Sequence, residues 1–151
     1  MNVEDQVVAL AAEAHASAWS AGSDVSAQTR KAQAICTRWQ EAAKQRFSNR
    51  FQAECGINGT KRGPSQKIDL VDLEDRVAYE LKSSPNNVHM KIYRDVFKTL
   101  VFNERNPTEP LTTLVFIAPK TGLQKLGSDF PKDVQAISSR LGVELKLREL
   151  A

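Results

Sequence analysis

The sequence predicts an α/β fold in which a mixed β-sheet is flanked by helices. Along the chain the spacing of apolar residues changes from a helical period to an alternating one and back. Residues 111–118 are almost entirely apolar, as expected of a central strand covered on both faces. With 151 residues, of which 41% are hydrophobic and 26% charged, the chain fits a single domain spanning 1–151.

Two helices are expected before the sheet. Residues 3–21 carry apolar side chains at steps of three and four, and Gly22 follows as a stop. A second helix is expected from Ala27 to about Phe51, with Ser26 as its N-cap. The alanine-rich residues 1–24 have no basic segment typical of a secretory signal. We therefore expect them to form an N-terminal helical extension that serves as an oligomer surface.

The alternating pattern begins at residue 67. Residues 67–73 and 76–82 predict two strands of a hairpin joined at Glu74-Asp75, after a glycine-rich loop over 55–66. The rest of the chain predicts a helix over 88–103, a strand over 111–118, a helix over 131–141 and a strand over 143–147.

The hairpin brings polar residues together. If Glu74-Asp75 is the whole loop, Leu73 faces Arg76, and counting back pairs Asp69 with Glu80. Lys82 shares the face of Glu80 because side chains on a strand repeat every two residues. This pattern has two interpretations: the solvated face of an amphipathic hairpin with weak surface ion pairs, or a chemical site.

A chemical site is favoured by the residue types. Two adjacent carboxylates suit Mg²⁺, which prefers oxygen ligands and keeps waters for a substrate phosphate. A neighbouring lysine can orient or deprotonate the attacking water, or stabilise a pentavalent phosphorane. Burial and an adjacent metal ion are both expected to lower the pKa of such a lysine towards that of a base.

The segment Ile68-Asp69 with Tyr79-Glu80-Leu81-Lys82-Ser83 resembles the signature of the PD-(D/E)XK nuclease superfamily. Within it, DLVD and YELKS are similar to the active-site strands of small homodimeric type II restriction endonucleases. The resemblance implies a restriction-endonuclease-like sheet and a site that holds Mg²⁺, with Mn²⁺ able to replace it. It implies that Asp69 and Glu80 ligate the metal, that Lys82 is the catalytic lysine, and that the Leu81 carbonyl is a further ligand.

The sequence differs from this signature before Asp69, where Gln66-Lys67-Ile68 replaces the proline of the nominal motif. In many members an acid on the preceding helix also contributes to metal binding, and Glu41 is the acid available there. A solvated Glu41 in contact with Arg38 and Lys44 explains that residue equally well.

Charge along the chain is uneven. Residues 1–27 hold four acidic and no basic residues, whereas residues 28–67 hold nine basic and two acidic ones. A basic block attracts a polyanion, although a solvated helix face gives the same pattern. Polar residues after Lys82 extend the expected DNA contacts, with helix capping as the alternative for the asparagines. The expected nucleic-acid-binding residues are Arg46, Arg50, Lys61, Arg62, Ser83, Ser84, Asn86, Asn87, His89 and Lys91.

The sequence therefore predicts a Mg²⁺-dependent endonuclease that cuts double-stranded DNA, of the restriction type and acting as a homodimer. The alternatives are a nuclease toxin, a repair or junction nuclease acting on DNA or RNA, and a non-catalytic nucleic-acid-binding protein. No apolar run is long enough to cross a bilayer. Cys36 and Cys55 fit free thiols in a reducing compartment, so we expect a cytoplasmic protein.

Overall fold

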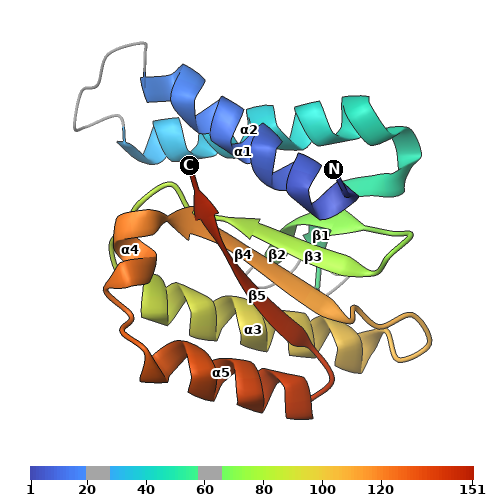
Figure 1. Ribbon diagram of the computed structural model, residues 1–151. Coiled ribbons are helices and arrows are strands. Elements are labelled where there is room, and N and C mark those ends of the chain that lie inside the picture. Colours follow the sequence, from blue (N-terminus) through green and yellow to red (C-terminus); the bar gives the residue numbers. More distant parts are fainter. Residues whose placement is uncertain (20–27, 58–65) are drawn as a thin grey trace.

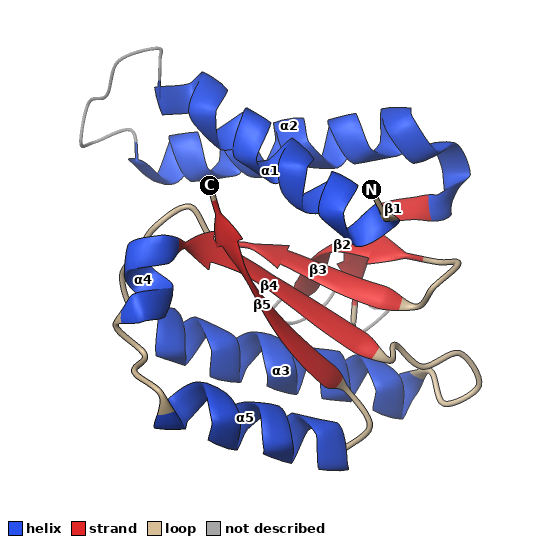
Figure 2. Cartoon of the chain, in the orientation of Figure 1, coloured by secondary structure: helices blue, strands red, loops and turns tan. Residues whose placement is uncertain are grey.

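The computed structural model, which describes residues 1–19, 28–57 and 66–151, contains a five-stranded mixed sheet with helices on both faces (Figures 1 and 2). Strand order follows the sequence; β1, β2 and β3 are antiparallel, and β3, β4 and β5 are parallel. The strands are β1 Phe51–Gly56, β2 Lys67–Asp72, β3 Val77–Leu81, β4 Thr113–Pro119 and β5 Glu144–Leu150. The helices are α1 Val3–Trp19, α2 Gln28–Phe47, the 3-10 helix η2 Ser48–Arg50, α3 Val88–Arg105, α4 Lys120–Gln124 and α5 Asp129–Arg140.

Both faces of the sheet are covered. Helices α1 and α2 lie over one face, and α3 and α5 lie over the other (Figure 1). Two apolar clusters fill the space between the layers, one around Trp39 and Tyr79 and the other around Ile92 and Phe116. The sequence prediction of a mixed sheet flanked by helices, with 111–118 forming a central strand, is thus confirmed. No helix in the described part of the chain is both long enough and apolar enough to cross a membrane.

Helix α1 belongs to the core of its own chain. Val7 and Ala11 are fully buried, and the Trp39 indole donates a hydrogen bond of 3.0 Å to the Val7 carbonyl. The start of α1 is tied to β5, since Glu4 accepts from Lys146 at 2.9 Å and also pairs with Arg148. The apolar side of this helix, which we expected to serve an oligomer, is therefore used inside the subunit.

Three elements differ from the sequence prediction. Helix α2 ends at Phe47 because Ser48 adopts a left-handed backbone (φ 52°), so strand β1 begins where a helix was expected. The short helix α4 was not predicted. The hairpin turn has four residues, 73–76, and its last residue, Arg76, is also left-handed (φ 56°).

Asp72 organises this turn. Its Oδ1 atom accepts the backbone N–H groups of Glu74 at 3.0 Å and Asp75 at 3.2 Å. The Arg50 guanidinium donates two parallel hydrogen bonds of 2.9 Å to the same carboxylate. Because Asp72 is buried, this paired geometry compensates the cost of removing its charge from water.

Replacing Asp72 with alanine is expected to lower the free energy of unfolding by about 3 kcal/mol, since it removes the buried partner of Arg50 and leaves two turn amides without their acceptor. Urea unfolding measures the change. The matched control is Asp75→Ala, because Asp75 also pairs with Arg50 but is 65% exposed; we expect it to cost less than about 1 kcal/mol. Equal losses in the two variants would contradict a structural role specific to Asp72.

Candidate active site

Strand pairing places three carboxylates at one level of the sheet. Strand β2 pairs Leu70 with Tyr79 and Asp72 with Val77, and continuing this register sets Asp69 opposite Glu80. The predicted register is thus confirmed for residues 70–72 and 77–79, which pair directly, and the pair of Asp69 with Glu80 is its continuation. On the other side of β2, the pairs Ala53–Leu70 and Cys55–Ile68 bracket Glu54 and Asp69, which therefore lie opposite each other.

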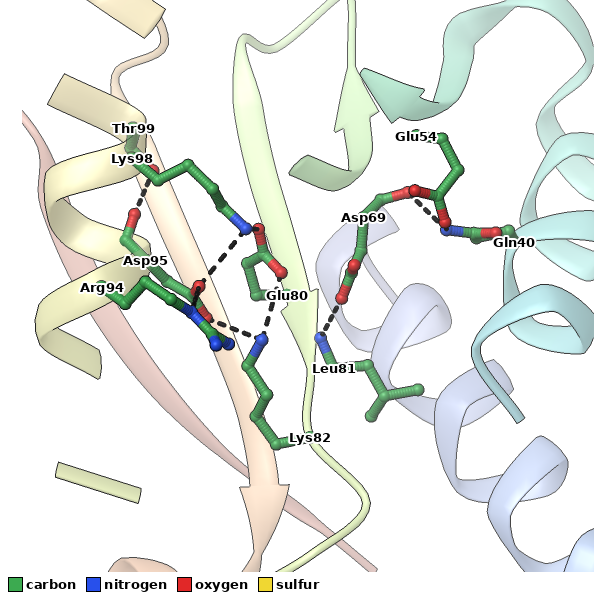
Figure 3. A network of polar contacts seen from close by, with 10 residues as sticks. All are labelled: Gln40, Glu54, Asp69, Glu80, Leu81, Lys82, Arg94, Asp95, Lys98 and Thr99. Atoms are coloured by element: carbon green, nitrogen blue, oxygen red, sulfur yellow. Dashed lines mark hydrogen bonds and ion pairs between the residues drawn. The ribbon is translucent and has the colours of Figure 1, made fainter. Parts of the chain in front are cut away.

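Glu80 is fully buried, and its side chain extends towards α3 (Figure 3). Its carboxylate forms ion pairs with Lys98 and, at 3.4 Å, with Lys82. Burial raises the pKa of Glu80 well above its usual value, and the negative charges of Asp69 and Asp95 raise it further, against the opposing effect of the two lysines. The interpretation of this hairpin as a solvated face is therefore wrong, because α3 covers it.

Lys82 sits inside the same network. Its ammonium Nζ lies 2.9 Å from Asp95 Oδ2 as well as beside Glu80, and its side chain is 11% exposed. Burial lowers the pKa of Lys82, but the carboxylates of Glu80, Asp95 and Asp69 raise it by more, so the net shift is upward. Burial thus acts in the expected direction, and the chain's own carboxylates outweigh it.

Asp69 has different neighbours from Glu80, although the two residues are opposite in register. Its Oδ2 atom accepts the Leu81 backbone N–H at 3.0 Å, and Figure 3 shows its side chain on the α2 side of β3. The alternation of β2 breaks here, because Ile68 packs in the cluster under α3 and Leu70 in the cluster under α1 and α2. The expectation that both carboxylates project to one face is therefore wrong.

Asp69 instead gathers with residues of β1 and α2. Ligand atoms of Cys36, Glu54 and Asp69 all lie within 4.8 Å of one another. The Gln40 amide donates to Glu54 Oε1 at 3.0 Å and to the Asp69 carbonyl at 2.7 Å, which fixes this group. Burial, together with Asp69 and Glu54, raises the pKa of the Cys36 thiol, so the available ligands are carboxylate oxygens.

Glu41 does not point into this group. It is exposed, whereas the adjacent Gln40 is buried and makes the contacts just described. Successive helical residues differ by about 100° around the axis, so neighbouring positions face different surroundings. The residue of α2 that reaches the site is thus Gln40, and the additional acid is Glu54 from β1.

The expected DNA-binding arginines have protein partners. Arg50 is engaged by Asp72, Glu74 and Asp75 at the hairpin turn. Arg46 donates to Gln6 on α1 at 3.2 Å and remains exposed. Lys61 and Arg62 lie outside the described residues. Of the two expected arginines that the structure describes, Arg50 is therefore committed to the hairpin turn, and Arg46 is the exposed one.

The residues after Lys82 do lie next to the site. Ser83 and Ser84 follow β3 directly, and the Ser84 hydroxyl accepts the Asn86 backbone N–H at 3.2 Å. Asn87 is the N-cap residue of α3, with a left-handed backbone, and among the described contacts its side chain makes no capping hydrogen bond. His89 and Lys91 follow in the first turn, where burial and the charges of Lys82 and Arg94 lower the pKa of Lys91.

Sequence reasoning missed four residues that hold this centre: Gln40, Glu54, Asp95 and Lys98. Asp95 and Lys98 carried a usable signal, because both are charged residues on the buried side of α3. Asp95 falls on the stripe of α3 that buries Val88, Ile92, Thr99 and Phe102, and a charge on a buried stripe calls for a partner. Gln40 and Glu54 carried no such signal, because their roles depend on how α2 and β1 pack.

Replacing Asp95 with asparagine is expected to lower the free energy of unfolding by about 3 kcal/mol, because two buried lysines then share one carboxylate. Adding Lys98→Met restores charge balance and is expected to recover part of the loss. Arg94→Ala is the control, since Arg94 also contacts Asp95 but is 58% exposed. Denaturant unfolding of the four proteins tests this; a double variant less stable than Asp95→Asn alone would contradict the charge-balance account.

Comparison of the chain with protein-family models, with curated proteins and with solved structures found no significant match.

Proposed function

We propose that this protein is a divalent-metal-dependent endonuclease that hydrolyses phosphodiester bonds of double-stranded DNA, acting as a type II restriction endonuclease. The observation that supports it most is the pairing of fully buried Glu80 with nearly buried Lys82, at the level of Asp69 on the adjacent strand. Surface ion pairs do not require such burial. Burial is required, however, where charged groups must act on a phosphate away from bulk water.

The carboxylates suit a hard divalent cation. Asp69 and Glu54, whose carboxylate oxygens approach each other, would hold Mg²⁺, with Glu54 in the place expected for Glu41 and with the Leu81 carbonyl as a further oxygen ligand. Glu80, the other expected ligand, is paired with Lys82 and Lys98 on the α3 side of β3. The choice of Glu54 is supported by its approach to Asp69 and by the Gln40 hydrogen bond that orients it. When bound, the ion would lower the pKa of a water molecule and neutralise charge on the phosphate.

The chain's own residues supply the remaining roles. Lys82, whose pKa is raised, acts as a cation that donates hydrogen bonds to a phosphate oxygen as negative charge builds there. Asp95 positions its ammonium group from α3, and Lys98 balances the charge of Glu80. A homodimer with two-fold symmetry would present two such centres, one to each strand of DNA.

The direct test is cleavage of supercoiled plasmid in Mg²⁺. Asp69→Ala and Lys82→Ala are each expected to reduce cleavage at least about 100-fold while leaving DNA binding largely intact. Glu41→Ala is the matched control and is expected to cut normally, because Glu41 is not among the residues whose ligand atoms meet at Asp69. Cleavage that persists in Asp69→Ala or Lys82→Ala protein would overturn the proposed mechanism.

The products of a long DNA then separate the related activities. Discrete bands agree with the restriction type, a smear would assign a toxin or repair nuclease, and cutting of RNA alone would assign a ribonuclease. Gel-shift binding in every divalent metal without any cleavage would assign a non-catalytic DNA-binding protein.

The choice of acid is tested separately. Glu54→Gln is expected to raise the Mg²⁺ concentration for half-maximal cleavage by about tenfold or more, because even supporting groups of a metal site matter by that factor. Glu41→Gln is the control and should leave the requirement unchanged. A raised Mg²⁺ requirement in Glu41→Gln, with none in Glu54→Gln, would show that Glu41 and not Glu54 is the additional metal ligand.

A further inference from the structure

A pocket of about 740 Å³ lies beside the loop that follows β3 and Lys82. The loop after β3 and the start of α3 form one wall, and residues of α4 and α5 form the other. Its volume falls in the range of small-ligand sites, roughly 300–1,000 Å³. Neither the carboxylates nor Lys82 line it, so it is separate from the proposed cleavage centre.

Aromatic rings line this pocket. The ring of Phe130 meets Tyr93 edge to face at a centroid distance of 5.2 Å and His89 in the same manner at 6.4 Å. Tyr93 is 52% exposed, so much of its ring is free to contact a ligand. Such an arrangement suits a flat aromatic ligand that stacks on a ring.

Polar groups at the same opening can read the edge of such a ligand. Asn86, Asn87 and Lys125 line the pocket with the rings. An amide side chain offers both donor and acceptor atoms, and that of Asn87 makes no capping bond within the described part of the chain. Nucleobases present this combination of a flat face and an edge of donors and acceptors.

The pocket walls are fixed against each other at Gly122. A Cβ atom at this position would lie 2.7 Å from Val88 Cγ2 and 2.9 Å from the Pro85 Cα. Helix α4 therefore packs directly on the loop after Lys82, and the opening between the two walls is preformed. A preformed pocket binds its ligand with less loss of conformational entropy.

We propose that this pocket accepts one unstacked nucleobase of the strand being cut, close to the cleaved phosphodiester; this rests on the proposed nuclease function. Pro85, at the pocket rim, is three residues after Lys82, and three extended residues span at most about 11 Å. A nucleotide next to the reacting phosphate lies within this reach. The preferred substrate is then DNA with an unpaired or extruded base near the cut.

The test compares two duplexes of the same sequence, one fully paired and one carrying a single bulged 2-aminopurine, bound to the wild-type chain in EDTA. We expect tighter binding of the bulged duplex and a change in 2-aminopurine fluorescence as the base enters the pocket. Tyr93→Ala is expected to weaken binding of the bulged duplex by about 10-fold, within the range measured for loss of base stacking. Its binding of the paired duplex should be nearly unchanged.

Phe97→Ala is the matched control. Phe97 is another exposed aromatic residue on α3, one helical turn from Tyr93, but it does not line this pocket. We expect it to change neither affinity by more than about twofold. If Tyr93→Ala does not fold, Asn87→Ala replaces it, with the same expected loss. Equal binding of the two duplexes by the wild-type chain, or equal losses in the pocket and control variants, would overturn the proposal.

The two proposals fail in different experiments. Because the binding test needs no metal, a preference for the bulged duplex without plasmid cleavage in Mg²⁺ would overturn the nuclease function but retain the base pocket. Plasmid cleavage without any preference for the bulged duplex would retain the nuclease function but overturn the base pocket.

Discussion

A carboxylate at the centre of a sheet that is covered on both faces must be compensated, and the neighbourhood of Glu80 is built around this requirement. Lys82 reaches Glu80 from the end of its own strand, Lys98 reaches it from α3, and Asp95 balances the second lysine. Well-packed apolar side chains would often stabilise such a site as well or better. We therefore infer that the buried charges are present because the function of the protein needs them. Binding and hydrolysis of a phosphate is a function with such a need.

The same constraint explains the position of the site. The register of β1, β2 and β3 sets Glu54, Asp69 and Glu80 at one level, where Asp69 caps the backbone N–H of Leu81. Beyond that level the chain leaves the sheet, and the loop to α3 packs against α4 at Gly122. Charged groups are thus held between rigid layers, while the adjoining loop forms the rim of a pocket open to solvent.

The alternating and helical periods of the sequence were enough to predict eight of the structure's elements, α1, α2, β2, β3, α3, β4, α5 and β5, and the hairpin register. The register survived an error in the turn, because a loop of residues 73–76 has the same midpoint as the two-residue loop Glu74-Asp75. What failed depends on packing or on single backbone angles. The left-handed Ser48 ends α2 early, and one step around a helix separates exposed Glu41 from buried Gln40. The upward pKa shift of Lys82 comes from Glu80 together with Asp95 and Asp69, and Asp95 lies on α3, outside the hairpin.

Asp69 and Glu54 are proposed to bind one divalent cation between neighbouring strands. Anomalous scattering from crystals soaked in Mn²⁺ tests it most directly. The account predicts a single strong peak in this centre, within about 2.0–2.3 Å of a carboxylate oxygen of each residue, a distance typical of small divalent cations. A peak bound elsewhere, or none at Mn²⁺ concentrations that support cleavage, would contradict it.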